Sequence, residues 1–234
     1  MSARDNDGMS ARELAELAAL LSDRSRAQLC LCLLDGRAWT AVELAAAASI
    51  APSTASEHLS RLVDGGLLVE QRRGRHRYLR LAGPRAADLL EAMLGYLGPT
   101  RPAPTLRAAT SAAAHARART CYDHLAGRLG VAIADAMRAR DLLTDDFALT
   151  DAGAEWLAIQ MPADAAHRSA RPLTRPCPDW TERRYHLAGA AGARICAQLF
   201  TREWIRRTGS GRAVAVTPAG HTALRELLGM DTEL

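Results

Sequence analysis

The stretch from Val42 to Leu81 places the strongest constraint on how this chain can fold. Thr40, followed three residues later by Glu43, forms a capping box and predicts the start of a short alanine-rich helix. A break at residues 50–52 ends that helix. Pro52 suits the first position of the next helix, because a backbone N–H has no helical partner there. Two helices joined by a tight turn are therefore expected.

The second of these helices, expected from Pro52 to Val63, has one apolar face and one polar face. The apolar positions repeat at helical spacing and are Ala55, Leu59, Leu62 and Val63. The polar positions occupy the rest of the surface and are Ser53, Thr54, Ser56, Glu57, His58 and Arg61. The glycine pair 65–66 ends the helix, because glycine accepts the left-handed conformation that follows many helices.

A basic hairpin follows the two helices. Residues 67–71 and 76–81 read as strands around the tip Arg72-Arg73-Gly74-Arg75. Four arginines lie within six residues here, whereas the net charge of +4 and the pI of about 9.0 would not by themselves establish a polyanionic partner. Helix, turn, polar-faced helix and basic hairpin together predict a winged helix-turn-helix, a unit that reads double-stranded DNA.

The S-T-x-S-x-H-L run at residues 53–59 and the R-x-G-R-x-x-Y run at residues 72–78 resemble the ArsR/SmtB regulators. These are bacterial repressors that release DNA when an effector binds, and the resemblance covers roughly residues 10–97. By position it assigns major-groove contacts to Ser53, Thr54, Ser56, His58 and Arg61. It assigns the wing contacts to Arg72, Arg73, Arg75 and Arg77. At Ala51 the family usually carries a capping hydroxyl, so the cap is expected to be weaker by ~1 kcal/mol.

The resemblance also implies a homodimer in which the first and last helices of the module pair with those of a second chain. The last helix, expected over residues 85–97, carries a wide apolar stripe of Leu89, Leu90, Met93, Leu94 and Leu97. Packing of that stripe on the C-terminal half of the same chain is the open alternative. A two-fold dimer would require a pseudo-palindromic operator with half-sites about one DNA turn apart.

The domain organisation follows from composition. We expect a disordered tail over residues 1–9, the winged helix-turn-helix and dimerisation domain over 10–97, and a linker over 98–106 in which three prolines occur. The remaining residues, 107–230, are expected to form a sensor domain, because they are too many for a mere tail.

An internal repeat organises this sensor domain. The pattern H-L-A-G-x-x-G-x-x-I begins at His124 and again at His186, and a later L/V-T-x-A-G-x-x-x-L pattern begins at Leu149 and at Val216. Each copy, about 115–160 and 177–229, reads as helix, short hairpin, helix. The predicted fold class is therefore mainly α with short β-hairpins (α+β), with a pseudo-symmetric, winged-helix-like pair suited to holding something at its interface.

The metal sites usual in the resembled family are missing from the sequence. The helix before the recognition helix has alanines where thiols would be needed, and residues 85–97 contain no histidine. Cys30 and Cys32 lie two apart on a helix and point to different faces, so they cannot chelate one ion together. No metal ligand is assigned and no cofactor is required.

The candidate effector residues precede or open the two repeat copies: Cys121, His124, Cys177, Asp179, Trp180 and His186. If the repeats pack about a two-fold axis, the two histidines become symmetry mates and the two cysteines can approach one another. Such a group could ligate a thiophilic ion or form an oxidant-sensing thiol pair. The alternative is that these side chains are simply part of the core.

These patterns predict a sequence-specific DNA-binding transcriptional repressor that a small effector, bound in the C-terminal domain, releases from its operator. The alternative is a redox- or metalloid-responsive repressor that uses Cys121 and Cys177. A remote alternative is a helix-turn-helix fused to a catalytic domain, but no catalytic or nucleotide-binding motif occurs, so an enzyme is not expected. The absence of a long apolar run or signal peptide, and five scattered cysteines, predict a cytoplasmic protein without membrane contact.

Overall fold

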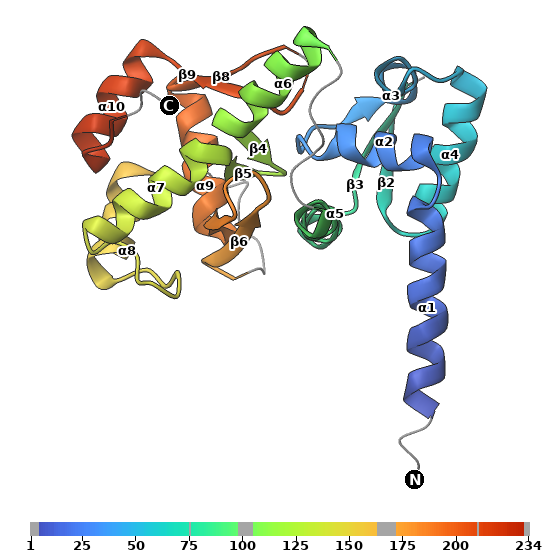
Figure 1. Cartoon of the computed structure of the whole chain (residues 1–234), viewed down its shortest axis with the longest axis horizontal. Coiled ribbons are helices and arrows are strands. Elements are labelled where there is room, and N and C mark those ends of the chain that lie inside the picture. Colours follow the sequence, from blue (N-terminus) through green and yellow to red (C-terminus); the bar gives the residue numbers. More distant parts are fainter. Residues whose placement is uncertain (1–4, 75, 98–104, 163–171, 210, 232–234) are drawn as a thin grey trace. The chain divides into compact units, whose positions relative to one another are not determined.

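The computed structural model describes residues 5–74, 76–97, 105–162, 172–209 and 211–231. It divides into an N-terminal unit, Met1–Leu90, and a C-terminal unit, Glu91–Leu234. Both units are mainly helical with short antiparallel hairpins, which confirms the predicted fold class (Figure 1). No helix in the described ranges is long and apolar enough to cross a membrane.

The N-terminal unit is a set of helices against one small sheet. Its elements are α1 (Asp5–Leu21), α2 (Arg24–Leu33), β1 (Trp39–Thr40), α3 (Ala41–Ala48), α4 (Pro52–Asp64), β2 (Leu68–Arg73), β3 (His76–Leu81) and α5 (Pro84–Leu97). The strands pair antiparallel in the order β1-β3-β2, with Arg72 opposite Arg77 near the tip. The pairing of β1 with β3 is an addition that the sequence did not predict.

The local signals of the helix-turn-helix act as expected. The side chain of Thr40 accepts from the backbone N–H of Glu43, and the Glu43 carboxylate accepts from the backbone N–H of Thr40, which completes the capping box. Pro52 occupies the first turn of α4, and Ala51 before it supplies no side-chain cap. Gly66 follows the helix with a φ of +75°, the left-handed conformation predicted there.

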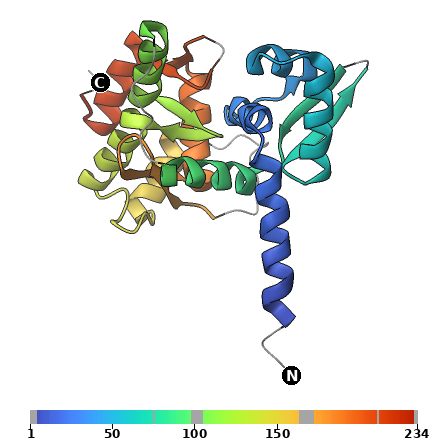
Figure 2. The same ribbon diagram turned by 45° about the vertical axis from the view of Figure 1, so that its right-hand side comes forward.

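The start of the chain differs from the prediction. Helix α1 begins at Asp5, so the tail expected over residues 1–9 is helical from its fifth residue. Residues 1–4 lie outside the described ranges. Figures 1 and 2 show α1 running beyond the other elements of its unit. At its C-terminal end, Leu20 packs so close to Gly65 that an added Cβ there would lie 2.3 Å from Leu20 Cδ1.

The division between the units falls inside α5, between Leu90 and Glu91, and not at the proline-rich segment 98–106. Most of that segment, 98–104, lies outside the described residues. A continuous hydrogen-bonded helix thus carries the chain from one unit into the other. The predicted stripe on α5 is only partly buried: Leu90 is buried, whereas Met93 and Leu97 are exposed. Tyr96, outside the predicted stripe, is exposed as well.

The C-terminal unit contains the two repeats. The elements of the first are β4 (Arg119–Cys121), β5 (His124–Ala126), α7 (Gly127–Ala139) and α8 (Asp151–Gln160), preceded by α6 (Leu106–Arg117). The elements of the second are β6 (Arg175–Asp179), β7 (Arg184–Ala188), α9 (Gly189–Thr201), β8 (Ile205–Arg207), β9 (Val214–Val216) and α10 (Pro218–Leu228). Each copy therefore has the predicted helix, hairpin and helix, with the first hairpin reduced to a bridge between Leu143 and Leu149. An additional hairpin, β4–β5 or β6–β7, lies at the start of each copy and was not predicted.

The matched positions of the two repeats have the same structural roles. Thr150 and Thr217 cap α8 and α10, and each side chain accepts from the backbone N–H of the glycine three residues later. An added Cβ on Gly153 or Gly220 would meet a backbone carbonyl oxygen at 1.9 or 2.0 Å. Only glycine permits that approach, which explains why both copies carry it.

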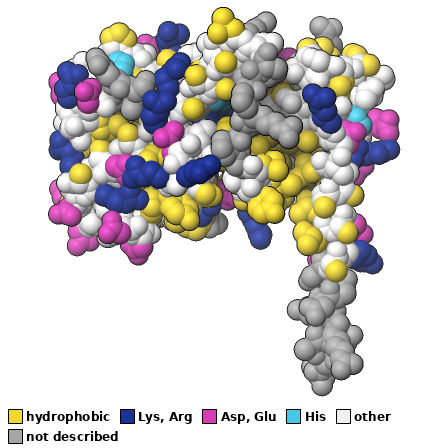
Figure 3. Space-filling model, in the orientation of Figure 1, with side chains coloured by type: hydrophobic (Ala, Val, Ile, Leu, Met, Phe, Trp, Pro, Cys, Tyr) yellow, Lys and Arg dark blue, Asp and Glu magenta, His cyan; other side chains and the backbone are white. Residues whose placement is uncertain are grey.

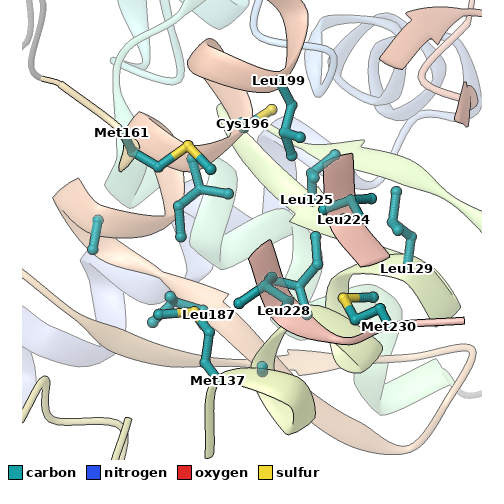
Figure 4. Packing of buried hydrophobic residues seen from close by; sticks show 14 of the residues in the cluster. Leu125, Leu129, Met137, Met161, Leu187, Cys196, Leu199, Leu224, Leu228 and Met230 are labelled. Carbon is teal, nitrogen blue, oxygen red and sulfur yellow. The ribbon is translucent and has the colours of Figure 1, made fainter. Parts of the chain in front are cut away.

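The two copies interlock around one core. Helix α7 packs on β7 of the second copy, and α9 packs on β5 of the first. The core draws on both copies, including Leu125, Leu129, Leu187, Leu199 and Leu224 (Figure 4). Because each copy supplies the other's packing surface, the pair forms one folding unit.

Candidate functional site

The first candidate surface is the polar face of α4. Ser53, Thr54 and Ser56 are exposed near the N-terminus of the helix, while Ala55 and Leu59 are buried beneath them. Figure 2 shows α4 and the β2–β3 hairpin side by side in the N-terminal unit. Hydroxyl groups on the first turns of a helix can donate to and accept from base edges in a major groove.

Two more residues of α4 were predicted to face DNA, and the structure separates them. Arg61 is exposed and its Nη2 lies 2.7 Å from Oε1 of Glu57. His58, in contrast, is mostly buried, with Nε2 3.6 Å from Oδ1 of Asp23, the N-cap residue of α2. His58 lies three residues after Ala55, on the same side of the helix as the apolar stripe. The expectation that His58 faces the groove is therefore corrected: its side chain packs within the unit.

The wing presents fewer free arginines than predicted. Arg72 and Arg73 are exposed, although Nε of Arg72 lies 3.0 Å from Oε1 of Glu70. Arg77 is half-buried: its Nε donates to Oε2 of Glu70 at 2.5 Å and its Nη2 to the hydroxyl of Ser60 at 3.3 Å. Arg77 thus ties the wing to α4, and its assignment as a wing contact to DNA stays a prediction. Arg75 lies outside the described residues.

The second candidate site lies inside the C-terminal unit, where the unpredicted hairpins meet. Cys121 lies directly opposite His124 in the β4–β5 pairing, and Cys177 lies directly opposite His186 in the β6–β7 pairing. One potential ligand atom from each of the four lies within 4.8 Å of the others. The sulfur atoms are 3.9 Å apart and the imidazole centroids 5.1 Å apart. We call these four residues the Cys–His cluster.

Every member of the Cys–His cluster is buried, and the most exposed, His124, is only 3% exposed. Nδ1 of His124 lies 3.3 Å from Oδ1 of Asp123, and Nδ1 of His186 lies 3.3 Å from Oδ2 of Asp179. Within the described part of the chain, neither Nε2 atom has a hydrogen bond of acceptable geometry. A buried polar atom without a partner is costly, so these nitrogens call for an explanation.

The electrostatics of the cluster favour a thiolate. The Cys121 thiol and the imidazoles of His124 and His186 lower the pKa of Cys177 well below its usual range. The contact with Cys177, together with burial, raises the pKa of Cys121. Burial alone would lower the pKa of His124, but Asp123 and Cys177 raise it to about 9. A thiolate and imidazoles in one pocket are the forms and groups that bind thiophilic ions.

Asp179 holds the surroundings of the cluster in place. Its carboxylate accepts from Nη2 of the fully buried Arg119 at 3.1 Å, from the backbone N–H of Gly127 at 2.6 Å and from the hydroxyl of Thr181 at 2.6 Å. Although burial would raise it, the pKa of Asp179 lies well below its usual range because of His186, Arg119 and Thr181. Asp179 therefore orients His186 from behind and is not itself within the cluster.

Trp180, the remaining predicted effector residue, lies apart from the cluster. Its ring packs under the guanidinium of Arg119, whose Cζ is 4.7 Å from the ring centroid. It also lines a surface hollow of about 570 Å³ together with Pro178, Arg183 and Tyr185. The hollow is large enough for a small organic molecule. Asp179 also lines it, and the same carboxylate lies beside His186 of the Cys–His cluster.

The sequence prediction named these four residues as candidate effector residues and assigned no metal ligand, and the structure brings the four ligand-type side chains together. The Cys–His spacing is three residues in the first hairpin and nine in the second, so no shared linear pattern marked them. The usable signal was the cross-strand pairing: a tight turn after Cys121 places His124 opposite it, with Tyr122 at a φ of 60°. Predicting the two hairpins would have placed each histidine opposite its cysteine, but bringing the two pairs together depends on the packing of one repeat on the other.

Comparisons with known proteins match both parts of the chain. A helix-turn-helix domain family model matches residues 21–72. The uncharacterized HTH-type transcriptional regulator YdfF of Bacillus subtilis (strain 168) is 36% identical over 221 residues, which is 93% of this chain and 97% of YdfF. The similarity to YdfF thus extends through the C-terminal repeats as well as the helix-turn-helix.

Solved structures similar to this chain cover the N-terminal part. The homodimeric winged helix-turn-helix DNA-binding domain of Mb0332 from Mycobacterium bovis, a possible ArsR-family regulator, is 29% identical, covering 42% of this chain and 86% of that one, with a TM-score of 0.35. The transcriptional repressor BigR from Xylella fastidiosa is 27% identical, covering 43% of this chain and all of that one, with a TM-score of 0.37.

Proposed function

Since the chain belongs to the helix-turn-helix (HTH)-type transcriptional regulators, with an N-terminal domain of the predicted ArsR/SmtB type, we propose that it is a cytoplasmic repressor controlled by its C-terminal domain. It binds a pseudo-palindromic operator as a homodimer. An effector bound by the C-terminal repeats shifts the dimer toward a state with lower affinity for the operator.

One observation carries this proposal: exposed hydroxyl side chains on the first turns of α4 lie beside a hairpin with exposed arginines. The first turns of a recognition helix are the part that reaches base edges, and arginine at a wing reaches phosphates. Ser53, Thr54, Ser56 and Arg61 therefore read the sequence, while Arg72 and Arg73 supply contacts that do not depend on sequence.

Exposed apolar side chains support the homodimer. Leu14 on α1 is 67% exposed, and Tyr96 and Leu97 on α5 are 93% and 75% exposed. Figure 3 shows hydrophobic side chains along the surface of α1. Large apolar side chains left in water mark an interface, and these two helices are the ones that the ArsR/SmtB resemblance assigns to the dimer. A two-fold arrangement would place the two α4 helices on half-sites one DNA turn apart.

Selection of bound fragments from the genome that encodes the protein tests the function. The purified dimer should enrich fragments that share one pseudo-palindrome, with affinity at least ~10³-fold above that for unrelated DNA at the same salt. Binding that shows no sequence preference would contradict the proposal. Arg225→Ala is the control for variants of the wing arginines. It removes the same charge from an exposed position on α10, far along the chain from the wing.

The C-terminal effector site has a specific candidate in the Cys–His cluster, which favours the metal- or thiol-responsive alternative over an organic effector in the hollow beside Trp180. Recovery of a small organic molecule unchanged from the purified protein would favour the hollow. Its recovery in chemically altered form would favour the remote catalytic alternative.

A further inference from the structure

We propose that Cys121, His124, Cys177 and His186 together bind one thiophilic divalent metal ion, with Zn²⁺ as the type ion, between the two C-terminal repeats. As a binding site this inference stands on the C-terminal unit alone. As the identity of the effector it rests on the proposed function.

The dimensions of the Cys–His cluster fit tetrahedral coordination. Zn–S bonds of about 2.3 Å at tetrahedral angles place two sulfur atoms about 3.8 Å apart. The observed separation of the Cys121 and Cys177 sulfur atoms is 3.9 Å. A disulfide would need them about 2.05 Å apart. The four ligand atoms, all within 4.8 Å of one another, can therefore close around one ion with small side-chain movements.

The hydrogen bonding of the two imidazoles distinguishes a metal site from a redox-active thiol pair. Nδ1 of His124 is hydrogen-bonded to Asp123, and Nδ1 of His186 lies 3.3 Å from Oδ2 of Asp179 without acceptable hydrogen-bond geometry. Among the described residues, neither buried Nε2 atom has an acceptable hydrogen bond. In zinc sites, a histidine that binds the ion through one ring nitrogen usually donates its other ring N–H to a carboxylate, a carbonyl or water. A disulfide would use only the sulfur atoms and leave both Nε2 atoms unpaired.

Charge balance favours a divalent ion. Two thiolates and two neutral imidazoles carry a charge of −2, so one divalent cation makes the fully buried site neutral. A monovalent ion would leave an uncompensated negative charge, which is costly away from water. Binding releases to solvent the protons that the four ligands carry in the metal-free protein, and no oxidant or reductant is needed.

The pseudo-two-fold packing holds the ligands in position. An added Cβ on Gly192 of α9 would lie 3.3 Å from Cβ of His124, and one on Gly130 of α7 would lie 3.5 Å from Cβ of His186. Each histidine is thus backed by the helix of the other repeat. Metal binding would join the repeats at the point where they cross, because each hairpin supplies one cysteine and one histidine.

The site also neighbours the helix that leads to the N-terminal unit. Thr120, next to Cys121, accepts from Nη1 of Arg212 at 3.4 Å, and the same guanidinium is ion-paired with the buried Glu91 of α5. A change in the position of β4 on metal binding would therefore move Arg212 and alter its ion pair with Glu91. Arg212 and Glu91 both belong to the C-terminal unit, so this contact couples the metal site to the C-terminal part of α5.

Cobalt substitution of the full-length, chelator-treated protein tests the site. We expect one Co²⁺ per chain, with a thiolate-to-cobalt charge-transfer band and the intense visible bands of a tetrahedral ion, and displacement by one equivalent of Zn²⁺. Cys121→Ser and Cys177→Ser should each remove the charge-transfer intensity of one sulfur, and His124→Gln and His186→Gln should abolish the tetrahedral spectrum. Cys32→Ser, in the N-terminal unit, should leave the spectrum unchanged.

Circular dichroism of each variant shows whether it remains folded, and the two glutamine variants keep the test decisive if the serine variants do not fold. Absence of a tetrahedral spectrum in folded wild-type protein would overturn the metal site, as would a spectrum that the cysteine and histidine variants share unchanged.

Operator binding by the same samples, with and without one equivalent of Zn²⁺, tests the effector role. A shift of ~10-fold or more in affinity, lost in Cys177→Ser, supports it. Metal binding with unchanged operator affinity would overturn the effector role and leave the site in place. Failure to bind any DNA specifically would overturn the proposed function and leave the metal site in place.

Discussion

The two units place their candidate functional side chains in opposite ways. In the N-terminal unit Ser53, Thr54, Ser56 and Arg61 lie outside on α4, a helix whose other face is buried through Leu59 and Leu62. In the C-terminal unit a group of charged and ligand-type side chains lies inside, between two repeats that enclose Arg119, Asp179 and the Cys–His cluster. The first arrangement is suited to a large external partner, and the second to a small ion that the fold surrounds.

The largest expected effect concerns the buried ion pair. Asp179→Ala leaves the guanidinium of Arg119 buried without its partner, so the metal-free protein should lose ~3–5 kcal/mol of unfolding free energy. Asp135→Ala, which removes a partly exposed partner of Arg138 and Arg184, should cost under ~1 kcal/mol. Urea denaturation measures both. Equal losses would show that burial does not distinguish these pairs.

Metal removal should affect the stability of the C-terminal unit and not that of the N-terminal unit. At a free Zn²⁺ concentration of 100 times the dissociation constant, the C-terminal unit should gain ~2.7 kcal/mol of stability, which a chelator removes. Hydrogen exchange of the full chain should show this protection in peptides from β4–β5 and β6–β7 and not in peptides from α2–α4. Protection that spreads evenly over both units, or that persists in Cys177→Ser, would contradict the assignment.

The repeat interface should respond to a single methyl group. Gly192→Ala places a Cβ 2.4 Å from the carbonyl oxygen of Leu187 in the same repeat and 3.3 Å from Cβ of His124 in the other repeat, so it should cost ~1–3 kcal/mol. Gly95→Ala on α5 meets no described atom within 4 Å and should stabilise its helix by ~0.5–1 kcal/mol. Thermal unfolding of both variants is the measurement. A neutral Gly192→Ala would mean that the repeats pack less tightly than the structure shows.

The outer surface of the N-terminal unit should divide into two kinds of contact. Arg72→Ala should weaken binding to all DNA sequences alike and reduce the slope of log affinity against log salt by ~0.9. Ser56→Ala should instead change which base is preferred, by ~1–3 kcal/mol at one position. Binding measured at several salt concentrations on operator variants tests this division. The same effect of both variants on every sequence would refute it.

The smallest effect concerns α4 itself. Glu57→Gln removes an exposed ion pair with Arg61, which should change the unfolding free energy by less than ~0.5 kcal/mol. His58→Ala, which opens a packed position against α2, should cost more stability while leaving base preference unchanged. If His58→Ala altered base preference without loss of stability, the corrected position of His58 would be wrong.

The sequence predicted well wherever a signal was local. The capping box at Thr40, the proline that begins α4, the glycine after it and the hairpin with its basic tip were all confirmed. The repeat copies were also found, because their threonine caps and glycine contacts recur in the same order. Local hydrogen bonds and close contacts determine these features, so a few neighbouring residues suffice.

The errors arose where a side chain's direction depended on distant groups. His58 was predicted to contact DNA, but its side chain packs within the unit beside Asp23. The start of α1 at Asp5 was also missed, because helix propensity is a weak guide to the exact end of a helix. The division within α5 was missed because a proline-rich segment need not mark the boundary between two packed units.

By itself, the sequence determined that this protein has a winged helix-turn-helix and a duplicated second domain, since both follow from periodicity, capping and glycine positions. Only the tertiary structure decided that Cys121 and Cys177, 56 residues apart, lie 3.9 Å from each other with a histidine opposite each. The physical reason is the exchange of packing surfaces between the repeats: β5 rests on α9 and β7 on α7, and this long-range packing brings the ligands together.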